Sequence, residues 1–112
     1  MAVNTFYLRI VSAKKVFFSG RCVSIIVPVA DGQEEILAHH ENMVNAVENG
    51  VLKYKPEDAD EYTTVVVGTG FAQIINNRVT VLVETAELPE EIDKARALEA
   101  KERAEEQMRQ DQ

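Results

Sequence analysis

Few stretches of the chain combine residue types that could do chemistry. His39-His40, followed by Glu41, could be a fragment of a metal site. Adjacent residues of an extended chain point in opposite directions, however, and no further ligand follows at helical or turn spacing. A surface or partner-contact role is therefore favoured over metal binding. Gly68-x-Gly70 lacks the further glycine, the lysine and the helix of a phosphate loop, and indicates a bulge or a close backbone approach.

The remaining reactive side chains also have simpler interpretations. Cys22 has no base beside it in the sequence, which favours a small buried apolar role. The carboxylates of Glu34-Glu35 and of Asp58 to Glu61 lie in loops of like charge, where a solvated surface is favoured over an acid/base pair. No nucleophile with its base, no metal-ligand spacing and no cofactor loop emerges, so an enzyme is the weaker hypothesis.

Composition limits the partners and the compartment. The chain has 112 residues, 46% of them hydrophobic and 28% charged, which suits one compact domain with an appendage. Twelve Lys and Arg against 19 Asp and Glu give a net charge of −7, with no basic stripe between aromatics, which argues against nucleic acid. A single cysteine, no leader pattern and no apolar run of about 20 residues predict a cytoplasmic protein that meets a membrane only through another protein.

Short alternating segments fill most of the chain and must position these residues. The opening segment places Phe6, Leu8 and Ile10 on one side of a strand. Ser19-Gly20 is expected to end the next strand, and Pro28 to mark an edge or bulge at the end of the one that follows. In that following strand one face is predicted to carry Val23, Ile25, Val27 and Val29.

Turn signals recur about every ten residues through the rest of this region. Residues 39–47 are interpreted as a polar stretch, Asn49-Gly50 as a turn, and Pro56 to Glu61 as an acidic loop. Asn76-Asn77 tolerates the positive φ angles of a tight hairpin between the last two strands. Short strands with frequent turns predict a mainly β fold, an antiparallel sandwich or barrel.

The pattern changes at Pro89, which suits a first helical position and is followed by Glu90-Glu91, where the helix dipole favours negative charge. The rest of the chain consists of helix formers with a narrow alanine-rich stripe. A β domain over 1–88 and a helix over 89–112 are therefore expected, with the helix packed against a second helix or a partner surface.

The chain resembles the epsilon subunit of F-type ATP synthases over nearly its whole length. The resemblance rests on the order and spacing of three stretches, which are "FYLRIVSAKKVFFSG", "DGQEEILAHHENMVNAVENGVLKY" and "RVTVLVETAE" with "EIDKARALEAKERAEE". It implies an antiparallel β-sandwich of about ten strands followed by a helical hairpin, of which this sequence supplies the first helix and not the second. It also implies a non-catalytic rotor subunit without a cofactor.

The resemblance further implies contacts with the c-ring and with the gamma subunit, at the cytoplasmic face of the cell membrane. Family positions that face the c-ring match Ser12, Asp31, Gln33 and Glu34, and those that face gamma match His40 and Met43. The chain departs from the family's Gly-Glu-Leu-Gly-Ile and Pro/Gly/Asn-His-Ala-Pro runs here, which suggests altered loop geometry. A chain with one helix is expected to inhibit ATP hydrolysis poorly.

Some bacterial members bind ATP through Ile-Asp-x-x-Arg-Ala in the hairpin. The matching residues here are Glu87, Ile92, Asp93, Arg96, Ala97 and Arg103. A solvated ion pair between Asp93 and Arg96 is the favoured alternative. The family's nucleotide sites also draw basic residues from the second helix, which is missing here, so ATP binding is expected to be weak or absent. Two other functions stay open, a stand-alone β-sandwich adaptor that binds another protein and a small module that senses ATP.

Overall fold

The computed structural model describes residues 4–92, and β-strands make up most of that range. A single hydrogen-bonded sheet of nine strands runs in the order β4-β7-β8-β1-β2-β5-β6-β9, with β3 paired to β2. The strands are β1 (Phe6–Ser12), β2 (Val16–Val29), β3 (Gly32–Leu37), β4 (Met43–Val47), β5 (Gly50–Pro56), β6 (Thr63–Val67), β7 (Gly70–Ile75), β8 (Arg78–Val83) and β9 (Ala86–Glu87).

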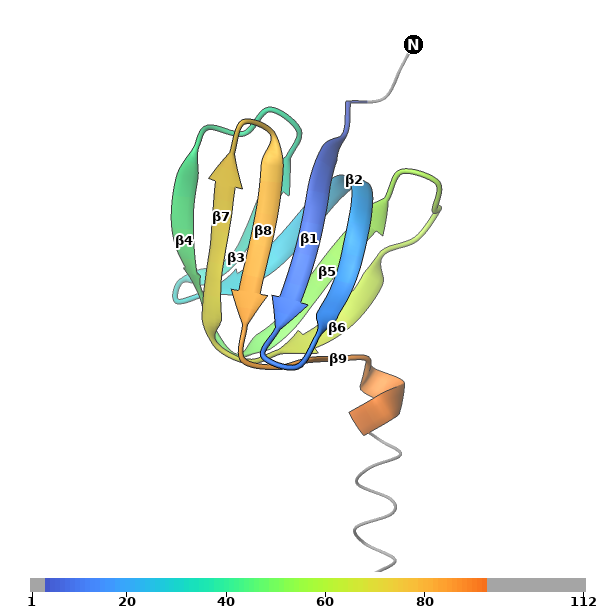
Figure 1. Ribbon diagram of the computed structural model, residues 1–112, viewed down its shortest axis with the longest axis vertical. Helices are drawn as coiled ribbons and strands as arrows, with labels where there is room; N and C mark the ends of the chain where they lie inside the picture. The colour runs from blue at the N-terminus through green and yellow to red at the C-terminus, as the bar shows by residue number, and fades with distance from the viewer. Residues whose placement is uncertain (1–3, 93–112) are drawn as a thin grey trace, which may run out of the picture.

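The sheet folds over itself into two layers, as Figure 1 shows. The first layer consists of β4, β7, β8, β1 and the first half of β2, and the second of β3, the second half of β2, β5, β6 and β9. The predicted mainly β sandwich is confirmed. One ladder differs from the expectation, because β1 and β8 pair in parallel, from Tyr7 with Arg78 to Ser12 with Val83. Strands from the two ends of the domain can pair this way because no tight hairpin has to join them.

Strand β2 joins the two layers. The expected break at Ser19-Gly20 is wrong, because β2 continues through it for 14 residues. A register irregularity between Cys22 and Ser24 places Val23 in a bulge. The bulge changes the alternation, so Cys22 takes the core-facing place predicted for Val23, while Ile25 and Val27 are buried as expected.

The connections combine confirmed and corrected predictions. Asn76 and Asn77 have φ angles of 47° and 65°, so the predicted positive-φ turn is confirmed.

Pro28 lies past Ile26, the last β2 residue paired with β5, so its missing N–H breaks no bond in that ladder. The supposed polar stretch contains strand β4, which the sequence analysis missed. The turn before Gly50 leads from the first layer to the second and does not form a hairpin.

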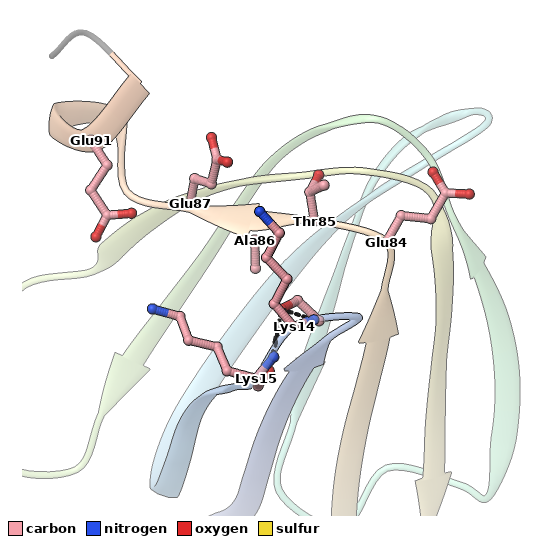
Figure 2. A pocket seen from close by; sticks show the side chains of 8 residues that line it. Lys14, Lys15, Glu84, Thr85, Ala86, Glu87 and Glu91 are labelled. Carbon is pink, nitrogen blue, oxygen red and sulfur yellow. Dashed lines mark hydrogen bonds between the residues drawn. The ribbon is translucent and has the colours of Figure 1, made fainter. Parts of the chain in front are cut away.

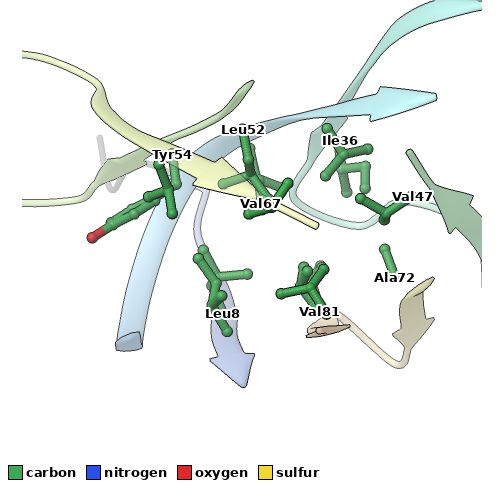
Figure 3. Close-up of a cluster of buried hydrophobic side chains, with 14 of the residues drawn as sticks. Leu8, Ile36, Val47, Leu52, Tyr54, Val67, Ala72 and Val81 are labelled. Atoms are coloured by element: carbon green, nitrogen blue, oxygen red, sulfur yellow. The ribbon is translucent and has the colours of Figure 1, made fainter. Parts of the chain in front are cut away.

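The core lies between the layers, where side chains from both meet (Figure 3). Leu8 and Val81 of the first layer face Leu52 and Val67 of the second, and all four are buried. Burying each such side chain contributes about 1.5–3 kcal/mol. The predicted core positions Phe6, Leu8 and Ile10 are 0–1% exposed. These contacts hold the two outer surfaces of the sandwich in fixed relation.

A helix begins at Pro89, as predicted, and the amide of Ile92 donates to the carbonyl oxygen of Leu88 at 3.3 Å. The remainder of the expected helix, 93–112, lies outside the described residues. Among residues 4–92, no helix has the length and apolar character that a bilayer crossing requires.

Candidate functional site: a docking face on the first layer

The outward surface of the first layer, called here the front face, differs in chemistry from the rest of the chain. Its strand residues include exposed apolar and arginine side chains and no aspartate or glutamate, although the chain has 19 acidic residues. Val44 and Phe71 are 63% and 43% exposed. The front face consists of Tyr7, Arg9, Val11, Val16, Ser19, Arg21, Val44, Ala46, Phe71, Gln73, Ile75, Arg78, Thr80 and Leu82.

Register lines up some of these side chains in a continuous row across five strands. Ala46 pairs with Phe71, Phe71 with Leu82, Leu82 with Val11, and Val11 with Val16. Paired residues project from the same side of a sheet, so these five form one apolar row. Aromatic and arginine side chains with few acids and lysines are typical of the core of a protein–protein interface. The front face is thus suited to cover by another protein.

The rear face, the outward surface of the second layer, has mixed charge. It carries Glu35 and Glu87 together with Lys53 and Lys55, and also the exposed apolar residues Leu37 and Val51. Ser24 points to this side, is 4% exposed, and its hydroxyl has no hydrogen-bond partner. A mixed-sign surface is typical of a solvated side. The two outer surfaces therefore favour different environments.

Two of the four predicted c-ring residues, Ser12 and Asp31, lie at turns. Ser12 closes the β1–β2 turn, where its amide donates to the carbonyl of Lys15 at 2.9 Å and its hydroxyl accepts from the amides of Lys14 and Lys15. Asp31 belongs to the β2–β3 turn, before Gly32 with a φ of 131°. Both turns lie in the lower half of Figure 1.

The β1–β2 turn also borders a hollow at the base of the sandwich (Figure 2). Lys14 and Lys15 line it opposite Glu84, Glu87 and the helical residue Glu91. Ser12 and Glu87 therefore line the same hollow. Ser12 is predicted to face the c-ring, and Glu87 is predicted to bind ATP. Ile92 is the only other predicted ATP residue in the described range. Asp93, Arg96, Ala97 and Arg103 lie outside it, and ATP binding stays a prediction.

Glu34 of β3 meets His40 and Asn45 at the edge where β3 and β4 approach each other. The Asn45 side-chain amide donates to Glu34 Oε2 at 2.7 Å, and His40 Nε2 lies 3.9 Å from Glu34 Oε1. Met43 is partly buried against the core. Glu34 therefore helps to close the edge between the layers, and residues predicted for different partners lie together. Gln33, by contrast, points to the rear face opposite Pro28.

The loop before β4 is fastened to the β7–β8 turn. The amide of His39, which has a φ of 64°, donates to Asn77 Oδ1 at 2.7 Å. Asn76 N donates to Asn42 Oδ1 at 2.8 Å, and Asn77 Nδ2 donates to the Thr5 carbonyl at 2.9 Å. Residues 4–92 contain no group of three or more His, Cys, Asp or Glu side chains that could hold a metal ion. The backbone amide of His39 therefore ties the His39-His40 loop to the β7–β8 turn.

Cys22 is fully buried, as interpreted from the sequence. Burial, together with the negative charges of Glu57 and Asp58, raises the pKa of its thiol from 9.0 to about 12. Burial likewise raises the pKa of Tyr54, whose ring packs against Phe18 at 4.4 Å between centroids. A thiol held in its neutral form is a poor nucleophile.

The front face is the feature that sequence reasoning missed. A signal was present, since the positions between core residues carry Tyr7 and Arg9 in one strand and Phe71 and Ile75 in another. Each strand alone is unremarkable because single exposed apolar residues are common. Only the pairing order brings them together.

Comparison with known proteins identifies relatives of this fold. The β-sandwich domain of the ATP synthase delta/epsilon chain matches residues 5–89. The ATP synthase epsilon chain of Ruminiclostridium cellulolyticum is 40% identical over 104 residues, which cover 93% of this chain and 76% of that protein.

Two solved assemblies contain similar folds. A chain of the Euglena gracilis mitochondrial ATP synthase, solved as OSCP/F1/c-ring in rotational state 1, superposes with a TM-score of 0.74 at 22% identity, over 94% of this chain and 66% of that one. A chain of the Tetrahymena thermophila mitochondrial ATP synthase central stalk/c-ring gives a TM-score of 0.65 at 14% identity, over 77% of this chain and 68% of that one.

Proposed function

The chain belongs to the ATP synthase delta/epsilon-chain family, and from this premise we propose that it is a non-catalytic rotor subunit that binds the gamma subunit through its front face. In this role it transmits ion-driven rotation of the c-ring, through gamma, to the catalytic head. It takes part in ATP synthesis without making or breaking bonds itself, at the cytoplasmic side of the membrane that holds the ring.

The observation that carries the proposal is the apolar row across five strands of the front face. Exposed Phe71 and Val44 would be costly surface on a protein that works alone, and removing their apolar area from water favours association. A rigid sandwich is suited to transmitting torque because a close-packed interior deforms little.

The c-ring contact is proposed for the two turns at Ser12 and Asp31. Their short connections are fixed by the strands on either side, and the Ser12 turn has four hydrogen bonds of its own to Lys14 and Lys15. Polar, well-ordered turns are suitable for contact with the polar loops of a membrane ring. Glu34 and Met43, which the family resemblance also assigns to partners, are proposed to act mainly by shaping the β3–β4 edge.

The proposal is tested by adding the full chain to cognate ATP synthase depleted of its epsilon subunit. The expected result is a stoichiometric complex with gamma and restored coupling between ATP hydrolysis and ion pumping. The chain alone is expected to turn over no ATP. A chain that fails to co-purify with gamma would instead support the stand-alone adaptor.

A further inference from the structure

We infer that three arginines of the front face, Arg9, Arg21 and Arg78, form a docking site for carboxylate side chains of the protein that covers this face. The inference rests on the proposed function, since it names the chemistry of the surface that gamma presents there. The three residues are called the arginine cluster.

Strand pairing gathers the cluster around one tyrosine. Tyr7 of β1 pairs with Arg78 of β8 on one side and with Arg21 of β2 on the other, and Arg9 follows two residues along β1. Neighbouring strands lie about 4.8 Å apart and the same-face repeat along a strand is about 6.6 Å. The backbones of the three arginines therefore lie within about 10 Å of one another, a distance that long side chains can bridge.

Tyr7 helps to orient the cluster. The Arg78 guanidinium carbon lies 5.8 Å from the centre of the Tyr7 ring, within cation–π range. The Tyr7 hydroxyl is hydrogen-bonded to the hydroxyl of Ser19 on the neighbouring strand. On the far side Arg21 contacts the Thr5 hydroxyl at 3.5 Å. An arginine stacked on a ring keeps its outward N–H groups free for a partner.

The positive charge of the cluster has no counterpart in the described part of the chain. All three arginines are exposed, and none of their guanidinium groups lies within ion-pair distance of a carboxylate of residues 4–92. The front face has no acidic strand residue, whereas the chain as a whole carries −7. Positive charge concentrated on one side of an acidic protein favours a partner with negative charge.

The surroundings favour a protein carboxylate over a phosphate. Arg9 and Arg78 line a surface hollow of about 630 Å³ whose other walls are Tyr7, Val16, Ser19 and Thr80. Val16 also ends the apolar row, so the hollow is continuous with it. Phosphate sites commonly add backbone N–H groups from a turn or a glycine-rich loop, but here the cluster lies on paired strands. Arginine forks bind carboxylates with two parallel hydrogen bonds.

A site of this kind sets orientation and the rate of encounter. The apolar row by itself allows a partner to slide along the face, because apolar contact is not directional. Carboxylates held at the cluster fix the register at one end of the row. Long-range attraction from three charges also accelerates association, by about tenfold or more at low salt.

The test compares three variants of the full chain in stopped-flow binding to cognate gamma over a salt series. Arg9→Gln/Arg78→Gln is expected to associate about tenfold more slowly than the wild type at low salt, with the difference vanishing at high salt. Lys53→Gln/Lys55→Gln removes the same charge from the rear face and is expected to keep the wild-type rate. Arg9→Lys/Arg78→Lys should restore the association rate but dissociate faster, because lysine cannot form the two-bond fork.

The outcomes separate this site from the function. An Arg9→Gln/Arg78→Gln chain that binds gamma with the wild-type rate and salt dependence would overturn the carboxylate site and leave the rotor role intact. Wild-type chain that does not bind gamma at all would overturn both. Calorimetry with ATP or inorganic pyrophosphate tests the other ligand class. If the wild type binds either compound and Arg9→Gln/Arg78→Gln does not, the ligand of the cluster is a phosphate and not a protein carboxylate.

Discussion

The front and rear faces of the sandwich share one core but differ in chemistry. The front face combines Phe71 and Val44 with three arginines and no acids. The rear face also exposes an apolar side chain, Leu37, but carries charges of both signs, on Glu35, Lys53 and Lys55. Since the same buried side chains support both, packing does not explain the difference. The partner contact proposed for the front face would account for it, because an apolar row favours cover by another protein.

The largest expected effect concerns the close approach of strand β7 to strand β8 in the first layer. Gly70 begins β7, and a Cβ atom there would lie 1.9 Å from the carbonyl oxygen of Leu82. Gly70→Ala must displace backbone, and it is expected to lower the free energy of unfolding by about 3 kcal/mol. Urea unfolding followed by circular dichroism measures this.

The second layer supplies the matched control. Gly50 begins β5, and a Cβ there would meet the Pro28 side chain at 3.1 Å. Gly50→Ala is expected to cost much less, because a side chain can shift where a backbone carbonyl cannot. Equal losses in the two variants would contradict the proposed close approach at β7.

The second prediction compares apolar residues of the two faces directly. Phe71→Asp places a charge within the apolar row and is expected to weaken gamma binding about 30-fold, equivalent to about 2 kcal/mol. Leu37→Asp changes a rear-face residue of similar exposure, 50% against 43%, and is expected to leave the affinity unchanged. Surface plasmon resonance with immobilised gamma measures both. A larger loss for Leu37→Asp would move the docking surface to the rear.

The third prediction examines the bulge where β2 passes between the layers. The pKa of Cys22 is raised to about 12 from 9.0 by burial and by Glu57 and Asp58. Above pH 9 the unfolded thiol loses its proton before the folded one, so the free energy of unfolding falls as pH rises from 9 towards 12. The loss at pH 10 is about 1 kcal/mol.

Chemical unfolding at pH 8 and pH 10 measures the Cys22 effect. Cys22→Ala is expected to be less stable than the wild type at both pH values. Its free energy of unfolding should, however, fall less between pH 8 and pH 10. Part of the slope should remain in the variant, because burial also raises the pKa of Tyr54. Identical slopes in the two proteins would mean that the thiol is not held neutral at the bulge.

The smallest expected effect lies at the β3–β4 edge, where the two layers meet the solvent. Asn45→Ala removes the 2.7 Å hydrogen bond to Glu34 and is expected to cost about 0.5–1 kcal/mol. A double-mutant cycle with Glu34→Ala isolates the coupling between the two side chains. Zero coupling would show that the edge is held by Met43 and its apolar neighbours alone.

Local patterns in the sequence determined several of the strands and much of the core. Alternation places Phe6, Leu8 and Ile10 on the buried side because successive side chains of a strand point to opposite faces. Asn76-Asn77 predicts its own turn because asparagine tolerates a positive φ. The helix start at Pro89 is likewise a property of the residues beside it.

Only the tertiary structure decided what required contact between distant residues. The bulge at Val23 arises where β5 pairs with β2, and the parallel ladder joins β1 to β8. Glu34 accepts a hydrogen bond from Asn45 across the edge of the sandwich. The front face has the same origin, because the order of the strands, and not spacing in the sequence, places Arg78 and Arg21 on either side of Tyr7. Side-chain periodicity is a local property, whereas pairing and register depend on the whole folded chain.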